Sequence, residues 1–131
     1  MESALEYIAR KHKTLVNDYR TPDKNYVESC TFIANEIAKL LLQEGKKPQI
    51  MFIRGKLIDT INTETLVPVQ FNGKVEWGGH QVCFADGLAY DPLLDKPAPI
   101  EKYYKKAFNQ ELTVEVSVPF DELKKNQRKL K

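Results

Sequence analysis

The sequence predicts an α+β fold in which N-terminal helices pack on a mostly antiparallel sheet. Over the first 45 residues, apolar side chains recur at three- and four-residue spacing, which is the period of an amphipathic helix. From residue 49 onward, short apolar runs alternate with Asn-Gly and Asp-Gly dipeptides, which favour tight hairpin turns. Helices followed by paired strands are typical of a helical layer that covers a sheet.

Length and composition indicate one globular domain. The chain has 131 residues, of which 42% are hydrophobic and 29% are charged. The net charge of +2 is too small to indicate nucleic acid or a membrane as the main partner. Two cysteines, Cys30 and Cys83, provide no disulfide framework. A single bridge between them stays open, beside two free thiols in a reducing compartment.

The N-terminus lacks the basic-then-apolar pattern of a cleaved signal peptide, and no apolar run approaches membrane-spanning length. We therefore expect a cytoplasmic protein without a membrane partner. Export by a route that leaves no cleaved signal is compatible with the same sequence.

Two helices are predicted first. One runs from residue 3 to about residue 19, and the segment 20–24 breaks it. The other starts near Asn25, which forms a capping-box spacing with Glu28, and stops at Gly45. Cys30 lies about one turn into this second helix, on its apolar stripe.

Strands follow. Residues 49–54 are apolar on both faces and predict a buried, central strand, whereas residues 57–65 predict a loop. Residues 66–71 and 74–77 predict a hairpin around Asn72-Gly73, because this dipeptide readily adopts the positive φ angles of a type I′ turn.

A second hairpin is predicted directly afterwards, with Asp86-Gly87 as its turn. With these two residues as the loop, Val82 falls opposite Asp91. His80 points to the same face as Val82, so Asp91 is its diagonal neighbour across the strands, about 7–8 Å away between backbone positions. Polar side chains can meet across such a diagonal.

The remaining segments are simpler. Residues 92–99 predict a proline-rich loop, 100–108 a short helix, and 112–118 a half-exposed strand, because apolar and polar residues alternate strictly there. Residues 120–131 predict a basic helix. Its Lys/Arg cluster is most often a solvated face, and nucleic-acid binding is the weaker interpretation.

Three residues suggest nucleophilic chemistry. A thiol near a helix N-terminus, such as Cys30, is favoured as thiolate by the helix dipole, although a cysteine on an apolar stripe is also a common core residue. An imidazole beside a carboxylate, as predicted for His80 and Asp91, is a general base with its orienting group. We expect the three to converge where the Cys30 helix meets the sheet. Cys83 points to the opposite face from His80 and is interpreted as core.

Residues around this triad are expected to contact the substrate. Trp77 is placed to wall the acyl site, and Gly78 and Gly79 permit close approach of a substrate or another backbone. Asn25 or the backbone N–H of Cys30 is expected to stabilise an oxyanion. His12 is interpreted as a packed or solvated helix residue. The spacing of Cys and His residues matches no metal site, and we expect neither metal nor cofactor.

The order of these motifs resembles the papain-like and transglutaminase-like superfamily, and is most similar to small bacterial papain-fold domains of the toxin type. The resemblance rests on the segments 29–32, 79–80 and 87–92, which read Ser-Cys-Thr-Phe, Gly-His and Gly-Leu-Ala-Tyr-Asp-Pro. It implies a single papain-fold-like domain over residues 1–131, with its core at about 26–118. It also implies Cys30 as nucleophile, His80 as base and Asp91 as orienter, and a bacterial toxin or effector role with an inhibitory or immunity partner.

The leading hypothesis is thus a cysteine hydrolase or acyltransferase that attacks an amide or acyl carbonyl of a protein or peptide. Peptidase, deamidase and transglutaminase reactions share this first step, and the sequence does not separate them. The alternative is a non-catalytic protein-binding module on the same fold. It predicts an inert, buried Cys30 and an exposed aromatic patch made of Tyr103, Tyr104 and Phe108.

Overall fold

A computed structural model describes residues 3–24 and 29–121 of the chain. The described part contains four α-helices and a five-stranded antiparallel sheet, so the predicted α+β class is confirmed. The helices are α1 (Ala4–Lys11), α2 (Lys13–Tyr19), α3 (Ser29–Gln43) and α4 (Ile100–Ala107), with two short 3-10 helices, η1 (Pro22–Lys24) and η2 (Val69–Phe71). The strands are β1 (Gln49–Gly55), β2 (His80–Ala85), β3 (Leu88–Tyr90), β4 (Ala98–Pro99) and β5 (Leu112–Pro119).

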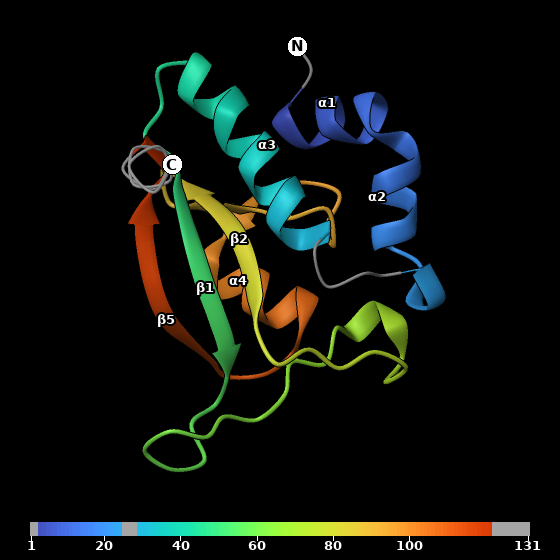
Figure 1. Ribbon diagram of the computed structural model, residues 1–131, viewed down its shortest axis with the longest axis vertical. Coiled ribbons are helices and arrows are strands. Elements are labelled where there is room, and N and C mark those ends of the chain that lie inside the picture. Colours follow the sequence, from blue (N-terminus) through green and yellow to red (C-terminus); the bar gives the residue numbers. More distant parts are fainter. Residues whose placement is uncertain (1–2, 25–28, 122–131) are drawn as a thin grey trace, which may run out of the picture.

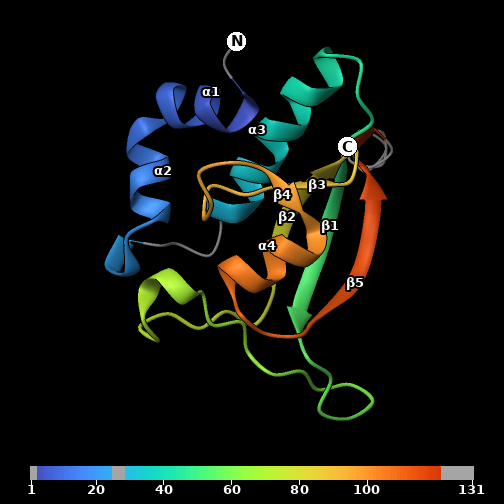
Figure 2. The ribbon, with the colours of Figure 1, turned by 180° about the vertical axis from the view of Figure 1, so that it is seen from behind.

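The sheet has the strand order β4-β3-β2-β1-β5. β1 pairs with β2 and β5, so the apolar run at 49–54 is an interior strand as predicted. α3 lies on one side of β1 and β2, and α4 lies on the other (Figures 1 and 2). The single helical layer that the sequence predicts is therefore incomplete, because the late helix covers the opposite face.

The first predicted helix is divided in two. His12 leaves helical geometry, with φ −116° and ψ 49°, and separates α1 from α2. Each half buries its own apolar residues: Leu5 and Ile8 in α1, and Val16 and Tyr19 in α2. Figure 1 shows the two helices at an angle to each other. The bend allows α2 to bring Tyr19 toward the sheet, which matters for the site below.

α3 supports the sheet with the predicted stripe. Ile33, Ala34, Ile37 and Leu41 are all buried, and Gly45 ends the segment with a φ of +84°. The predicted cap, Asn25 with Glu28, lies outside the described residues.

The first predicted hairpin is largely wrong. Only one bridge forms there, between Leu66 and Trp77, and η2 replaces the rest of its first strand. Pro68 has no N–H to donate to a ladder, which explains why the pairing stops. The turn itself is as predicted, because Asn72 and Gly73 both have positive φ angles.

The second hairpin is confirmed, including its register. Asp86 and Gly87 form the turn with φ angles of 53° and 80°, and Cys83 pairs with Tyr90. Continuing this register by one residue places Val82 opposite Asp91. β3 pairs with β2 only from Cys83 onward, so the first half of β2 is paired with β1 alone.

The other predictions have mixed outcomes. The helix at 100–108 is confirmed as α4, and the strand at 112–118 is confirmed as β5. Its predicted half-burial is wrong, because Val114 and Val116 are exposed along with the polar residues between and beside them. Segment 57–65 is a loop with one isolated bridge. The proline-rich loop contains an unpredicted two-residue strand, β4, which pairs with β3. The predicted basic helix lies mostly outside the described residues. Within the described ranges, none of the helices combines the length and apolar character needed to cross a membrane.

Candidate active site

His80 and Asp91 form a buried pair at the start of β2. His80 Nε2 lies 2.7 Å from Asp91 Oδ2, and the two side chains are 1% and 2% exposed. They come from the diagonal positions predicted for the hairpin. A buried ion pair is stable only when its remaining hydrogen-bonding groups are also satisfied, and the surroundings of Asp91 meet this condition.

Three further donors reach the Asp91 carboxylate. Tyr19 donates its hydroxyl to Oδ1 at 2.7 Å, Tyr103 donates to Oδ2 at 2.5 Å, and the Leu93 N–H donates to Oδ1 at 3.0 Å. Tyr19 Oη also lies 3.2 Å from His80 Nε2. Because the Tyr19 hydroxyl hydrogen goes to Asp91, its oxygen is left to accept from the imidazole. We call Tyr19, Leu93 and Tyr103 the Asp91 cage.

Cys30 completes the arrangement from the first turn of α3. Its thiol is hydrogen-bonded to His80 and to the backbone N–H of Gln81. Since Nε2 is engaged by Asp91, Nδ1 is the ring nitrogen available to the thiol. Gln81 lies in the half of β2 that β3 does not pair, so the N-terminus of α3 approaches β2 where its edge is open.

The charges of the three groups support one another. Burial opposes a charged imidazole, but the charge and hydrogen bond of Asp91, helped by Cys30, raise the pKa of His80 to about 9. Burial also opposes a thiolate at Cys30, yet the hydrogen bond and charge of His80 and the Gln81 N–H lower the pKa of that thiol. The pKa of Asp91 is lowered, against its burial, chiefly by His80. An imidazolium–thiolate pair at neutral pH is the state that these shifts favour.

Aromatic rings surround the imidazole. Trp77 stacks on His80 with ring centroids 4.6 Å apart and planes 18° from parallel. The Tyr19 ring stacks at 6.3 Å, and Phe108 meets His80 edge-on at 6.0 Å. The indole and phenol faces carry negative charge density, so they favour a protonated imidazole. Their packing also restricts rotation of the ring.

A small cleft of about 190 Å³ opens beside Cys30 and His80. Thr31, Gly79 and Gln81 line its near side, and side chains of β1 and β5 line the rest, including the ion pair of Arg54 and Glu115.

Of the predicted substrate-contacting residues, only Gly79 lines this cleft. Trp77 packs against the imidazole instead, and Gly78 is exposed and does not line the cleft. Asn25 lies outside the described residues, so its predicted role as an oxyanion donor stays a prediction.

The second cysteine and the second histidine are separate from this site. Cys83 is fully buried, as predicted for a core residue, and burial raises its pKa to about 12. Both cysteines are free thiols, so the open possibility of a Cys30–Cys83 bridge is excluded in this structure. His12 lies between α1 and α2, with its ring edge-on to Phe32.

The aromatic patch of the binding-module alternative is wrong. Tyr103 and Phe108 are buried, at 0% and 2% exposure, and only Tyr104 is partly accessible. Cys30, by contrast, is partly exposed at the cleft, whereas this alternative predicts a buried Cys30. Among the described residues, no three His, Cys, Asp or Glu side chains are placed to hold a metal ion.

The sequence missed the Asp91 cage. Tyr19 was recognisable only as part of the apolar spacing of the first predicted helix, and Tyr103 only as part of the predicted aromatic patch. Neither pattern reveals what the hydroxyl contacts. The available signal was chemical, since a buried tyrosine usually needs a hydrogen-bond partner for its hydroxyl.

Comparisons with protein-family models, curated proteins and solved structures found no match for this chain. The interpretation of the site therefore depends on its own geometry.

Proposed function

We propose that this protein is a thiol enzyme that attacks an amide or acyl carbonyl with Cys30, on a papain-like or transglutaminase-like core. The observation that carries the proposal is the placement of His80, whose Nε2 is bonded to Asp91 and whose ring is also hydrogen-bonded to the Cys30 thiol. An activated nucleophile, its base and the group that orients the base are the parts that this chemistry requires.

The proposed reaction proceeds in two halves. The Cys30 thiolate bonds to the carbonyl carbon, and the His80 imidazolium then gives its proton to the departing amine as the carbon–nitrogen bond breaks. This leaves a thioester on Cys30 and a neutral imidazole. His80 next takes a proton from water or an amine as it attacks the thioester, and the thiolate is released. Asp91 keeps the imidazole oriented in both halves.

The substrate we propose is a protein or peptide. The cleft is open and polar along one side, with room beside Cys30 for a side chain or a short stretch of backbone. Hydrolysis of a peptide bond, deamidation of glutamine and transfer to an amine remain the three reactions in scope. A toxin or effector role with an inhibitory or immunity partner belongs to the same proposal.

The experiment that tests the proposal is the pH dependence of Cys30 alkylation by iodoacetamide, in the unaltered protein and in His80→Asn. We expect an apparent thiol pKa clearly below the free value of about 8.5, returning toward it in the variant. Cys30→Ala provides the control, because it leaves Cys83 as the only thiol.

The same samples, checked for folding by circular dichroism, are then given a glutamine-containing peptide, and release of ammonia or of cleaved peptide is measured. A Cys30 that reacts only on unfolding, at a rate indifferent to His80, would refute the proposal.

A further inference from the structure

A second and larger concave surface shares no lining residue with the Cys30 cleft. It has a volume of about 670 Å³, against about 190 Å³ for the Cys30 cleft. The segment between β3 and α4 forms one wall, and α4 forms another. Figure 2 shows that segment on the side of the molecule that also carries α4. We call this surface the basic groove.

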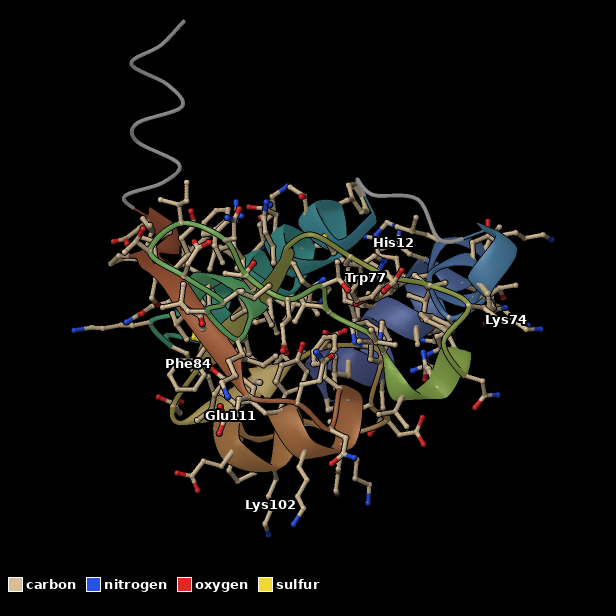
Figure 3. All side chains as sticks on the ribbon, turned by 90° about the horizontal axis from the view of Figure 1, so that it is seen from below. His12, Lys74, Trp77, Phe84, Lys102 and Glu111 are labelled. Carbon is tan, nitrogen blue, oxygen red and sulfur yellow. The ribbon has the colours of Figure 1, made fainter. Side chains whose placement is uncertain are left out.

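The charge of the basic groove is one-sided. Four cationic side chains line it, against one carboxylate, that of Asp95. The cations are Arg20, Lys96, Lys102 and Lys106. In the part of the chain that the structure describes, no carboxylate lies within ion-pair distance of the three lysines. Figure 3 shows Lys102 extending from α4 away from the ribbon.

The base of the groove is apolar and aliphatic. Leu93 and Ala98 are buried there, Leu94 and two prolines also line the groove, and Gln70 is the one uncharged polar residue in its lining. None of its lining residues is aromatic, so it offers no platform on which nucleic-acid bases could stack. Cationic walls above an aliphatic base fit an acidic peptide segment better than a nucleic acid.

The basic groove is also connected to the active site through the Asp91 cage. Leu93 lines the groove and donates its N–H to Asp91. Lys102 precedes Tyr103 on α4, so the outward face of that helix is the groove wall while its inward face holds the carboxylate. Arg20 follows Tyr19 and donates to the Pro92 carbonyl at 2.6 Å, directly beyond Asp91. Each member of the cage therefore belongs to, or adjoins, a residue of the groove.

We propose that the basic groove binds an acidic peptide segment of a partner protein, and that its occupation alters the reactivity of Cys30 through the Asp91 cage. The proposal that the groove binds a peptide depends on the groove alone. The proposal that binding alters Cys30 reactivity rests on the proposed function. An acidic segment bound to Lys102 and Lys106 shifts α4 or the 92–98 segment. Such a shift moves the hydrogen-bond donors of the Asp91 cage that these segments carry. Because the carboxylate orients His80, such a shift reaches the thiol.

The test uses fluorescein-labelled hexaglutamate as the probe and Lys102→Glu/Lys106→Glu as the variant. Lys124→Glu/Lys125→Glu is the matched control, since it makes the same change of net charge in the C-terminal segment. We expect binding by fluorescence anisotropy that weakens as salt rises. We also expect the groove variant to lose at least about tenfold in affinity and the control less than about twofold.

Absence of binding, or equal loss in both variants, overturns the groove as a site. Tighter binding of an oligothymidine of equal charge, with the same dependence on Lys102 and Lys106, overturns the peptide assignment.

The effect of groove occupation on Cys30 is tested by measuring the alkylation rate of Cys30 with and without saturating hexaglutamate. We expect the peptide to change this rate in the unaltered protein and to have no effect in the groove variant. An unchanged rate despite binding overturns the coupling. If Cys30 proves unreactive under all conditions, the proposed function fails, and the anisotropy measurement still decides the groove by itself.

Discussion

Tyr103 donates its hydroxyl to Asp91 Oδ2 at 2.5 Å, and this oxygen is the one that also receives the Nε2–H of His80 at 2.7 Å. The tyrosine and the imidazole thus share one carboxylate oxygen. Hydrogen bonds from Tyr103 and Tyr19 stabilise the negative charge of the Asp91 carboxylate, so the carboxylate does not depend on the imidazolium alone. The proton on His80 is consequently held less tightly than a carboxylate without these donors would hold it.

Tyr103→Phe tests this relationship. Loss of the hydroxyl leaves one lone pair of a buried carboxylate unsatisfied, which costs about 1–3 kcal/mol of unfolding free energy. Asp91 then depends more on the imidazolium, so the pKa of His80 should rise above its value of about 9 in the intact protein. Urea denaturation measures the first effect, and NMR titration of the His80 ring measures the second.

Tyr104→Phe is the control for that variant, because it removes a hydroxyl from the neighbouring residue of α4 without removing a donor to Asp91. A purely structural Tyr103 would lower stability in Tyr103→Phe and leave the His80 titration where it was.

Stability should fall at alkaline pH. The folded-state pKa of His80 is raised from 6.5 to about 9, so the folded protein holds this proton more tightly than the unfolded chain does. The resulting stabilisation is fully present below about pH 6.5 and is lost as the pH rises through about 9. Its upper limit is about 3 kcal/mol for a shift of this size.

The measurement is urea denaturation from pH 6 to pH 10. Asp91→Asn removes the main cause of the shift, so we expect a flatter stability profile in that variant, with a lower stability at neutral pH. Cys30→Ser separates the titration of the thiol from that of the imidazole. A profile of the intact protein that stays level up to pH 10 would contradict the raised pKa.

Much of this site could be predicted, because its central contact is local. A hairpin with an Asp-Gly turn has a fixed register, and that register alone places Asp91 diagonally from His80. Cys30 required a longer inference, from its position near a helix start and on an apolar stripe. The stripe follows from sequence periodicity, and the helix start follows from the capping-box spacing of Asn25 and Glu28.

The unpredicted parts depend on contacts distant in sequence. Tyr19 and Tyr103 lie 72 and 12 residues from Asp91, and nothing in their own segments indicates a carboxylate partner. The bend at His12 is equally hidden, because the apolar spacing continues through it. Pro68, by contrast, is visible in the sequence and argues against the first hairpin, because proline has no backbone N–H to donate to the pairing. Trp77 lies beside the triad, as predicted. Its ring stacks on the His80 imidazole and does not line the cleft.

Only one of the two cysteines should react in the folded protein. Cys83 is fully buried, and its pKa is raised to about 12 by that burial. In Cys30→Ala, Ellman's reagent should therefore release almost no colour until denaturant is added, and then the equivalent of one thiol. In Cys83→Ala, one thiol should react without denaturant. Rapid reaction of native Cys30→Ala would show that the core around Cys83 opens easily, and it would invalidate Cys30→Ala as a control for alkylation.

Trp77 should report the charge of His80 directly. It is the only tryptophan in the chain, and its ring lies 4.6 Å from the imidazole in a stacked geometry. A protonated imidazole in contact with an indole interacts with its π face and quenches its fluorescence. We expect the emission of the folded protein to increase as the pH rises through about 9, the pKa of His80.

His80→Asn should abolish this transition, and Asp91→Asn should move it to lower pH, because the carboxylate is the main group that raises the pKa. His12→Asn is the matched control, since His12 contacts Phe32 in another part of the molecule and should leave the transition unchanged. The transition thus measures the protonation of the proposed base without any substrate. If it were absent from the intact protein, or if it survived in His80→Asn, the imidazolium that the proposed mechanism requires would not be the group stacked on Trp77.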